Sequence, residues 1–167
     1  MSKAYYIGVE IGGTKQQLAV GLSDGTILDS RQVKLVYRRG AEDILDWLSD
    51  NIREYLAMAP YAGHIAGIGV GFGGPLETAT GRVLSSLQVP GWKNFQLKQW
   101  FETEFGLPVM VVNDTVTGGF AELYKGAGRN SENFFIRISV PVLAAVSIFI
   151  GNIMTGAALE RPISAIC

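Results

Sequence analysis

The chain has 167 residues, of which 48% are hydrophobic, and a formal net charge of −1 from 14 basic and 15 acidic side chains. This composition predicts a globular chain with one domain, or one domain and a fragment, and the scattered charges argue against nucleic acid as a partner. The most apolar window, residues 138–150, is shorter than the roughly 20 residues that cross a bilayer, so we expect no membrane partner.

Apolar periodicity predicts the elements in chain order. Strands are expected at 4–9, 17–22, 27–36, 65–72, 108–112 and 134–138, and helices at 41–58, 95–105 and 114–124. Three strands followed by alternating helices and strands predict an α/β fold with a mixed sheet. The start carries no secretory signal, and the single cysteine, Cys167, fits a reducing compartment, so we expect a cytoplasmic protein.

The segment Glu10-Ile11-Gly12-Gly13-Thr14-Lys15 lies between the first two predicted strands. Consecutive glycines let backbone amides approach a phosphate, while Thr14 adds a hydroxyl and Lys15 a cation. A carboxylate at the end of the first strand can hold the water shell of Mg²⁺. An ordinary glycine hairpin explains the same pattern equally well.

A second pattern, Val111-Val112-Asn113-Asp114, ends a predicted strand at the start of a helix. A carboxylate held there can accept the proton of a substrate hydroxyl, and the neighbouring amide can bind other hydroxyls. Asp also caps helices well, and on this segment alone the cap is the preferred interpretation of Asp114.

The third pattern is a polar, glycine-rich loop that runs from Gly73 to Trp92 after a predicted buried strand. Its polar groups suit a polyhydroxylated ligand, with Trp92 lining the site. A surface loop whose Trp92 fills the core is an equally good interpretation.

Together these residues resemble the ROK family of sugar kinases and repressors, which has the actin-like, ribonuclease H-like ATPase fold. EIGGTK corresponds to the family's first phosphate motif, GVGFGGPLE to its GxxxPGPxD-type loop, and VNDTVTGGFAE to its NDAN motif, over about residues 4–138. The resemblance implies a mixed five-stranded sheet with flanking helices. It also implies ATP-dependent, glucokinase-like phosphorylation of a hexose, with sugar and ATP as partners and Mg²⁺ as cofactor.

The resemblance further assigns roles to individual residues. Asp114 would be the general base. The substrate-binding residues would be Gly74, Glu77, Gln88, Asn113 and Asp114, and the residues that meet phosphate and Mg²⁺ would be Glu10, Gly12, Gly13, Thr14 and Lys15. No further metal site is expected, because the zinc motif of intact relatives is absent. Intact relatives are expected to be homo-oligomers.

The chain departs from the family pattern at several of these positions. Glu10 replaces an Asp, Thr115-Val116 replaces Ala-Asn, Gly73 replaces a proline, and Gln88 stands where many relatives present an Asn to the sugar. The preferred sugar therefore does not transfer. The chain begins on its first strand, without the winged-helix segment of ROK repressors, which favours the kinase branch.

After about residue 138 the sequence changes character: residues 139–167 are apolar, with almost no charge and no clean periodicity. If the codons of Val140–Ser147 are read from the third base, they can spell Ser-Gly-Ile-Gly-Gly-Gly-Phe, which resembles the family's second phosphate loop. In the same frame, Asn152–Gly156 can read Tyr-Tyr-Asp-Gly and Ile163–Cys167 can read Ile-Gly-His-Leu. We therefore predict a frameshift here, and a genuine divergent tail is the rival explanation.

The frameshift predicts a kinase lobe at 1–138, an aberrant tail at 139–167 and no carboxy-terminal ATP lobe. Such a fragment should lack turnover, because half of a cleft cannot position ATP against the sugar. The alternative is a non-catalytic sugar-binding or regulatory module, such as a ROK repressor without its DNA-binding segment.

Overall fold

The computed structural model describes residues 3–34, 39–86, 88–129, 133–139, 143–149 and 152–155, the last three ranges as backbone. The chain divides into two compact units, Met1–Asp114 and Thr115–Cys167. The elements are β1 (Tyr5–Ile11), β2 (Lys15–Leu22), β3 (Ile27–Lys34), α1 (Ala41–Ala57), β4 (Ile65–Phe72), β5 (Leu76–Glu77), β6 (Arg82–Val83), α2 (Leu97–Phe105), β7 (Val109–Asn113), α3 (Asp114–Lys125), β8 (Asn133–Ser139), β9 (Leu143–Phe149) and β10 (Asn152–Thr155).

The first unit contains a mixed five-stranded sheet, as the resemblance implies, and the structure places its strands in the order β3-β2-β1-β4-β7. The hairpin-linked strands β1, β2 and β3 pair antiparallel, whereas β4 and β7 join in parallel. The parallel strands β1, β4 and β7 therefore end at the same edge of the sheet. Ligands commonly bind outside the carboxyl ends of parallel strands, so this edge is the place to look for a site.

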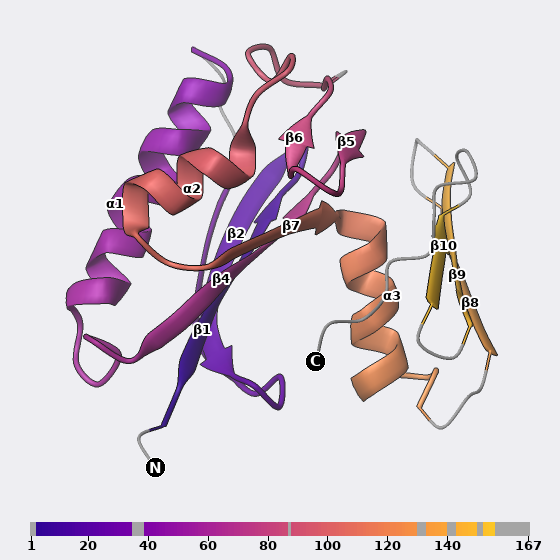
Figure 1. Cartoon of the computed structure of the whole chain (residues 1–167), viewed down its shortest axis with the longest axis horizontal. Helices are drawn as coiled ribbons and strands as arrows, with labels where there is room; N and C mark the ends of the chain where they lie inside the picture. Colours follow the sequence, from indigo (N-terminus) through magenta and orange to yellow (C-terminus); the bar gives the residue numbers. More distant parts are fainter. Residues whose placement is uncertain are drawn as a thin grey trace. The chain divides into compact units, whose positions relative to one another are not determined.

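One face of this sheet is covered by helices α1 and α2, which Figure 1 shows on the same side. Alternate strand residues such as Ile7, Val9 and Leu18 are buried on that face, because side chains of a strand alternate between its two sides. Helix α1 meets them with a stripe of residues at helical spacing, among them Ile44 and Leu48. The strands that lead to the carboxyl edge of the sheet are therefore supported by a packed hydrophobic core.

Helix α2 begins at Leu97, two residues later than the sequence predicts. Phe95 is taken into an isolated bridge with Val83, whose N–H donates to the Phe95 carbonyl at 2.8 Å. A second feature that the periodicity did not reveal is the β5–β6 hairpin, whose strands have two residues each. Strands this short carry no period, so only the fold reveals them.

In the second unit, β8, β9 and β10 form an antiparallel meander in that order. Strand β8 was expected, whereas β9 and β10 fall in the apolar tail, where the sequence showed no clean periodicity. The predicted boundary at residue 138 stays a prediction, as does the frameshift, and part of that segment lies outside the described residues. Within the described ranges, no helix is long and apolar enough to span a bilayer.

Candidate functional site at the carboxyl edge of the sheet

The first glycine motif forms the tight connection between β1 and β2. The Gly12 N–H donates to the Lys15 carbonyl at 3.2 Å, and a Cβ on Gly12 would lie 3.0 Å from that carbonyl oxygen. A side chain at position 12 would crowd this contact, so glycine fits the turn. Thr14 and Lys15 are exposed at its tip. The segment is a glycine hairpin, and its use as a phosphate loop remains a prediction.

Glu10 lies on β1 just before this hairpin and is half-buried. It pairs across the strands with Gln17, and its carboxylate accepts a hydrogen bond from the Gln17 side-chain amide. Mg²⁺ is commonly held by one or two carboxylates together with substrate phosphates and water. A single carboxylate beside a predicted phosphate loop fits that donor set, so the residues present are compatible with Mg²⁺.

Asn113 and Asp114 stand where β7 passes into α3. The side-chain amide of Asn113 donates to the carbonyls of Phe72 at 3.3 Å and Gly74 at 3.2 Å, which fixes the start of the loop after β4. Asp114 is half-buried and is the first residue of its helix. A carboxylate at this position can act as a helix cap or as a base, and its place at the start of the helix suits both roles.

Gly73 lies between the end of β1, where the glycine hairpin starts, and Asp114 at the start of α3. Its N–H donates to the Ile11 carbonyl at 2.9 Å, so the loop after β4 is tied to the end of β1. A Cβ on Gly73 would lie 3.1 Å from Asp114 Oδ2, 3.3 Å from the Ile11 oxygen and 3.6 Å from Gly12 Cα. The Asp114 carboxylate therefore lies beside the start of the predicted phosphate loop. The sequence motif identified Gly73, but not this contact.

The loop after Gly74 folds back as the β5–β6 hairpin, which contains Glu77. The Glu77 carboxylate accepts a hydrogen bond from the Thr80 hydroxyl and bonds from the Arg82 guanidinium at 3.4 Å. The Thr80 bond first, and then the bonds and charge of Arg82, lower the pKa of Glu77 from its ordinary value of 4.5. The Glu77 carboxylate is bonded within its own hairpin. A sugar hydroxyl that binds Glu77 would therefore bind a carboxylate that also accepts bonds from Arg82.

The last part of the loop carries Gln88 to the glycine hairpin. The side chain of Gln88 occupies the space in which a side chain at Gly13 would begin. Trp92, by contrast, is 1% exposed and packs edge to face on Phe72 and Phe95, with ring centroids 5.4 and 5.3 Å away. Of the two interpretations of Trp92, the core residue is therefore the one observed.

The residues at or after the carboxyl ends of β1, β4 and β7 are called the loop edge: Gly12, Gly13, Gly73, Gly74, Gln88, Asn113 and Asp114. Sequence reasoning missed Gln16, which follows the hairpin. Its side chain is 1% exposed, and its Oε1 has no hydrogen-bond partner within the described part of the chain. A glutamine beside Lys15 is expected at the surface, so nothing in the local pattern identifies it as buried.

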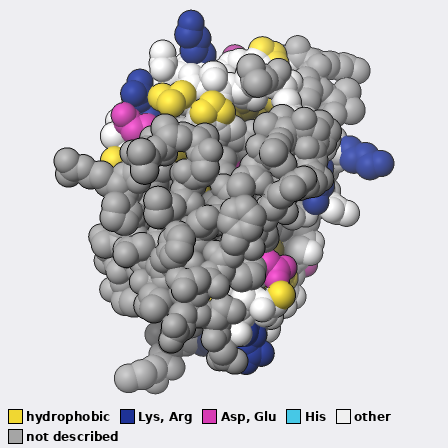
Figure 2. Space-filling model, turned by 90° about the vertical axis from the view of Figure 1, so that its right-hand side faces the viewer, with side chains coloured by type: hydrophobic (Ala, Val, Ile, Leu, Met, Phe, Trp, Pro, Cys, Tyr) yellow, Lys and Arg dark blue, Asp and Glu magenta, His cyan; other side chains and the backbone are white. Residues whose placement is uncertain are grey.

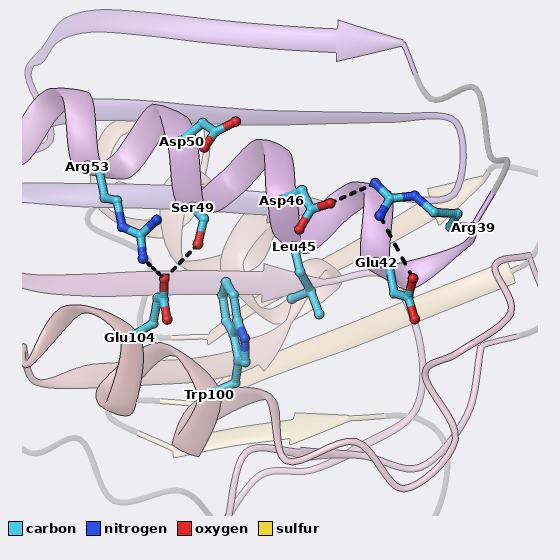
Figure 3. A pocket seen from close by; sticks show the side chains of 9 residues that line it. All are labelled: Arg39, Glu42, Leu45, Asp46, Ser49, Asp50, Arg53, Trp100 and Glu104. Carbon is cyan, nitrogen blue, oxygen red and sulfur yellow. Dashed lines mark hydrogen bonds and ion pairs between the residues drawn. The ribbon is translucent and has the colours of Figure 1, made fainter.

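A hollow on the outer surface lies elsewhere, between α1 and α2, and is called the α1–α2 groove. It is lined by Arg39, Glu42, Leu45, Asp46, Ser49, Asp50, Arg53, Trp100 and Glu104. Figure 3 shows Arg39 facing Asp46 and Glu42, and Glu104 facing both Arg53 and Ser49. None of the predicted site residues lines this groove, and its arginines are paired with its own carboxylates.

The surface charge agrees with the near-neutral composition. On the face drawn in Figure 2, the visible Lys and Arg side chains of the described residues stand apart from one another. The described residues that are visible on that face therefore form no continuous basic patch.

Comparison with known proteins identifies relatives over nearly the whole chain. The sequence profile described as the ROK family matches residues 6–158. A glucokinase of Halalkalibacterium halodurans is 30% identical over 162 residues, which are 93% of this chain and 47% of that protein.

Solved structures agree with these sequence matches. A ROK family glucokinase from Streptomyces griseus, in complex with glucose and AMPPNP, superposes with a TM-score of 0.75 at 28% identity, over 94% of this chain and 49% of that one. A ROK family transcriptional regulator, a homologue of the E. coli MLC protein, shares the fold at a TM-score of 0.79 and 23% identity, over 92% of this chain and 39% of that one.

The chain spans about half the length of the curated relatives it matches. The match to the family profile includes every residue of the loop edge and continues past residue 138. The actin-like α/β fold that the motifs implied agrees with these structural neighbours. On the extent of the profile match, the chain belongs to the ROK family.

Proposed function

We propose that the chain is the sugar-side lobe of an ATP-dependent hexose kinase. The observation that carries this proposal is the position of Asp114 Oδ2, 3.1 Å from where a Cβ on Gly73 would lie, while the Gly73 N–H is bonded to the Ile11 carbonyl at the start of the glycine hairpin. A base and a phosphate loop at this range are what transfer to a hydroxyl requires, because catalysis of this step rests on positioning and charge stabilisation.

In the proposed reaction, Asp114 accepts the proton of the sugar hydroxyl that attacks the γ-phosphate of ATP. Asn113 holds the loop after β4 in place through its two bonds, and we propose that its side chain also contacts a sugar hydroxyl. The amides of Gly12 and Gly13, with Lys15, receive the phosphate. Mg²⁺, when bound, neutralises phosphate charge, and Glu10 is the residue that would hold its water shell.

Gly74, Glu77 and Gln88 complete the proposed sugar contacts. A hexose as the substrate class is part of the proposal and is supported by the glucokinase relatives, whereas the preferred hexose is not part of it. A cytoplasmic location and homo-oligomeric intact relatives also remain proposals. We further propose that the 167 residues alone bind sugar without turnover, since the kinase relatives are about twice as long.

The proposal is tested with two proteins: the 167-residue chain, and the chain extended through any shifted frame that the gene contains. The first should bind glucose in a calorimeter and release no ADP from ATP; the second should release ADP. In the extended protein, Asp114→Asn should lower turnover by about 10² to 10⁴, the range for loss of a general base. Asp50→Asn, at an exposed position of helix α1, is the matched control and should leave turnover unchanged.

A non-catalytic sugar-binding or regulatory module is the second candidate. The structural likeness to the ROK family transcriptional regulator supports it at the level of the fold. Glucose binding that survives Asp114→Asn, with no ADP release from any form of the protein, would favour this module over the kinase.

The predicted frameshift has its own test. The coding DNA is resequenced from the codon for Phe134 through several hundred bases beyond the codon for Cys167. An open shifted frame that encodes a second glycine loop and a further lobe supports the frameshift. If no such frame exists, the tail is genuine and the module becomes the better proposal.

A further inference from the structure

The inference concerns Gln17, which stands on β2 between two charged residues of the predicted phosphate and Mg²⁺ site. Gln17 lies directly opposite Glu10 of β1 in the strand register, and Lys15 begins the same strand as Gln17. Directly opposite residues share a face of the sheet, and so do residues two apart on one strand. The alternate positions Ile11 and Leu18 are buried in the core, so the three polar side chains lie on the face away from α1 and α2.

The Gln17 carboxamide is bonded to both charged groups. Its nitrogen donates to the Glu10 carboxylate, and its oxygen accepts a long bond from the Lys15 ammonium at 3.5 Å. A carboxylate only accepts hydrogen bonds and an ammonium only donates them, whereas a carboxamide has one donor end and one acceptor end. Gln17 therefore links the two charged groups without carrying a charge itself.

Glu10 and Lys15 are near enough to form an ion pair, yet in the described part of the chain each is bonded to Gln17 and not to the other. They are diagonal neighbours of an antiparallel pair, at a separation of about 7–8 Å that long side chains can span. On its other side Lys15 stands opposite Lys34 of β3, where repulsion between like charges disfavours a lean toward β3. Glu10 is therefore the favoured partner of Lys15, and Gln17 lies between them.

This arrangement decides which charges stay available to a ligand. A direct ion pair would neutralise both groups, so Lys15 would attract phosphate less and Glu10 would attract a hydrated cation less. A neutral carboxamide orients both groups and leaves both charges for a ligand. Glu10 also has one methylene more than the Asp of the family pattern, and the bond from Gln17 restricts the added rotational freedom.

We propose that Gln17 is a positioning residue that keeps Glu10 and Lys15 apart and oriented toward Mg²⁺ and phosphate. This inference rests on the proposed function, because it needs the glycine hairpin to receive phosphate. Gln17 itself touches neither ligand. Without its carboxamide, Glu10 and Lys15 should form a direct ion pair, and the hairpin should lose affinity for the anion.

The first test uses the 167-residue chain, with inorganic phosphate as the probe in NMR titrations. Gln17→Ala should weaken phosphate binding about two- to fivefold, because phosphate then has to break an exposed ion pair. The same substitution in a Glu10→Gln background should leave phosphate affinity unchanged, since Lys15 has no carboxylate with which to pair. Gln32→Ala is the matched control: Gln32 is exposed opposite Gln17 on β3, and its loss should not alter binding.

Two results of these titrations would overturn the proposal. Unchanged or tighter phosphate binding in Gln17→Ala would show that the carboxamide does not keep Lys15 available. An equal loss of affinity with Glu10 present and in the Glu10→Gln background would show that Gln17 acts on the hairpin without any part for the Glu10 charge.

A thermal cycle without ligand separates failure of this inference from failure of the proposed function. Glu10→Gln and Lys15→Met are measured singly and together, first with Gln17 and then in the Gln17→Ala background. The stabilising coupling between the two positions should be larger by about 1–3 °C in Gln17→Ala, where the direct ion pair has formed. Equal coupling in both backgrounds overturns the separation of charges. Larger coupling in Gln17→Ala, with no phosphate binding by any variant, overturns the proposed phosphate loop and supports the separation.

Discussion

The loop edge and the α1–α2 groove both gather polar groups, but they are built in opposite ways. At the loop edge, glycines at 12, 13 and 73 let backbone and side chains approach to distances at which no Cβ would fit comfortably. In the groove, long charged side chains neutralise one another at an exposed surface. The close approach at the loop edge depends on the absence of a side chain at each glycine, whereas the charges in the groove are satisfied by one another. The loop edge should therefore be sensitive to small changes, and the groove tolerant of large ones.

The largest expected effect on stability comes from Gly73→Ala. Its methyl group would lie 3.1 Å from Asp114 Oδ2 and 3.3 Å from the Ile11 oxygen, so one of these groups has to move. Overpacking of this kind costs about 1–3 kcal/mol, and we expect a loss in that range in urea denaturation, together with weaker glucose binding.

The matched control is Gly69→Ala, a change within β4, the strand that ends just before Gly73. A Cβ at Gly69 meets nothing within 4 Å among the described residues, so alanine should be neutral or stabilising by about 0.4–1 kcal/mol through the unfolded chain. If both alanine variants have the same stability, the close approach at Gly73 does not constrain the loop edge.

The next largest effect is a gain in stability when Gln16, the buried residue just after the hairpin, is replaced. Its Oε1 has no partner within the described ranges, and an unsatisfied buried amide oxygen is costly. Gln16→Leu should raise the free energy of unfolding by about 1 kcal/mol, measured by urea denaturation. Gln17→Leu is the contrast: it removes the donor to Glu10 and should not stabilise the chain. A loss of stability in Gln16→Leu would show that the amide has a structural role.

These residues show how far the sequence could predict the molecule. The five strands of the first sheet and helices α1 and α3 were predicted to within a few residues, because burial on alternate or helical positions leaves a period in the sequence. Helix α2 started late, since Phe95 is used by a strand bridge. That bridge pairs residues from separate segments, so no local window contains it.

The candidate site was predicted as a set of residues, and the structure adds how they meet. The motifs named Gly13, Gln88 and Asp114, but the contact across Gly13 depends on two segments far apart in the sequence. Trp92 had two equal interpretations until Phe72 and Phe95 were found around it. Burial of Gln16 could not be expected either, because glutamine is usually exposed.

A pH-dependent effect on stability is expected at the β5–β6 hairpin, smaller than the effects at the loop edge and larger than the effect in the α1–α2 groove. The pKa of Glu77 is lowered in the folded chain, first by Thr80 and then by Arg82. A lowered pKa stabilises the fold above the ordinary value of 4.5, and this contribution is lost as the pH falls through the folded value. Stability should therefore decline less steeply below pH 4.5 in Glu77→Gln than in the unchanged chain.

Thermal melts between pH 3 and pH 6 measure this difference. Glu102→Gln is the control, an exposed glutamate of α2 whose partner is Lys98 at 3.7 Å. Parallel melting curves for Glu77→Gln and the unchanged chain would exclude a role of the Glu77 charge in the hairpin.

The smallest effect is expected in the groove, from Arg53→Ala. The Arg53 side chain is 60% exposed, and its ion pair with Glu104 joins α1 to α2. Exposed ion pairs contribute about 0–1 kcal/mol, because solvent screens the charges and both side chains lose freedom. Glu104 also keeps its bond from the Ser49 hydroxyl at 3.0 Å, so removal of the arginine leaves the carboxylate with a partner.

For Arg53→Ala we expect the free energy of unfolding, measured by urea denaturation, to change by no more than about 0.5 kcal/mol, and glucose binding to stay the same. Glu104→Ala completes a double-mutant cycle. A loss above about 1.5 kcal/mol, or altered glucose binding, would mean that the groove supports the loop edge through α1, and the contrast between a sensitive edge and a tolerant groove would not stand.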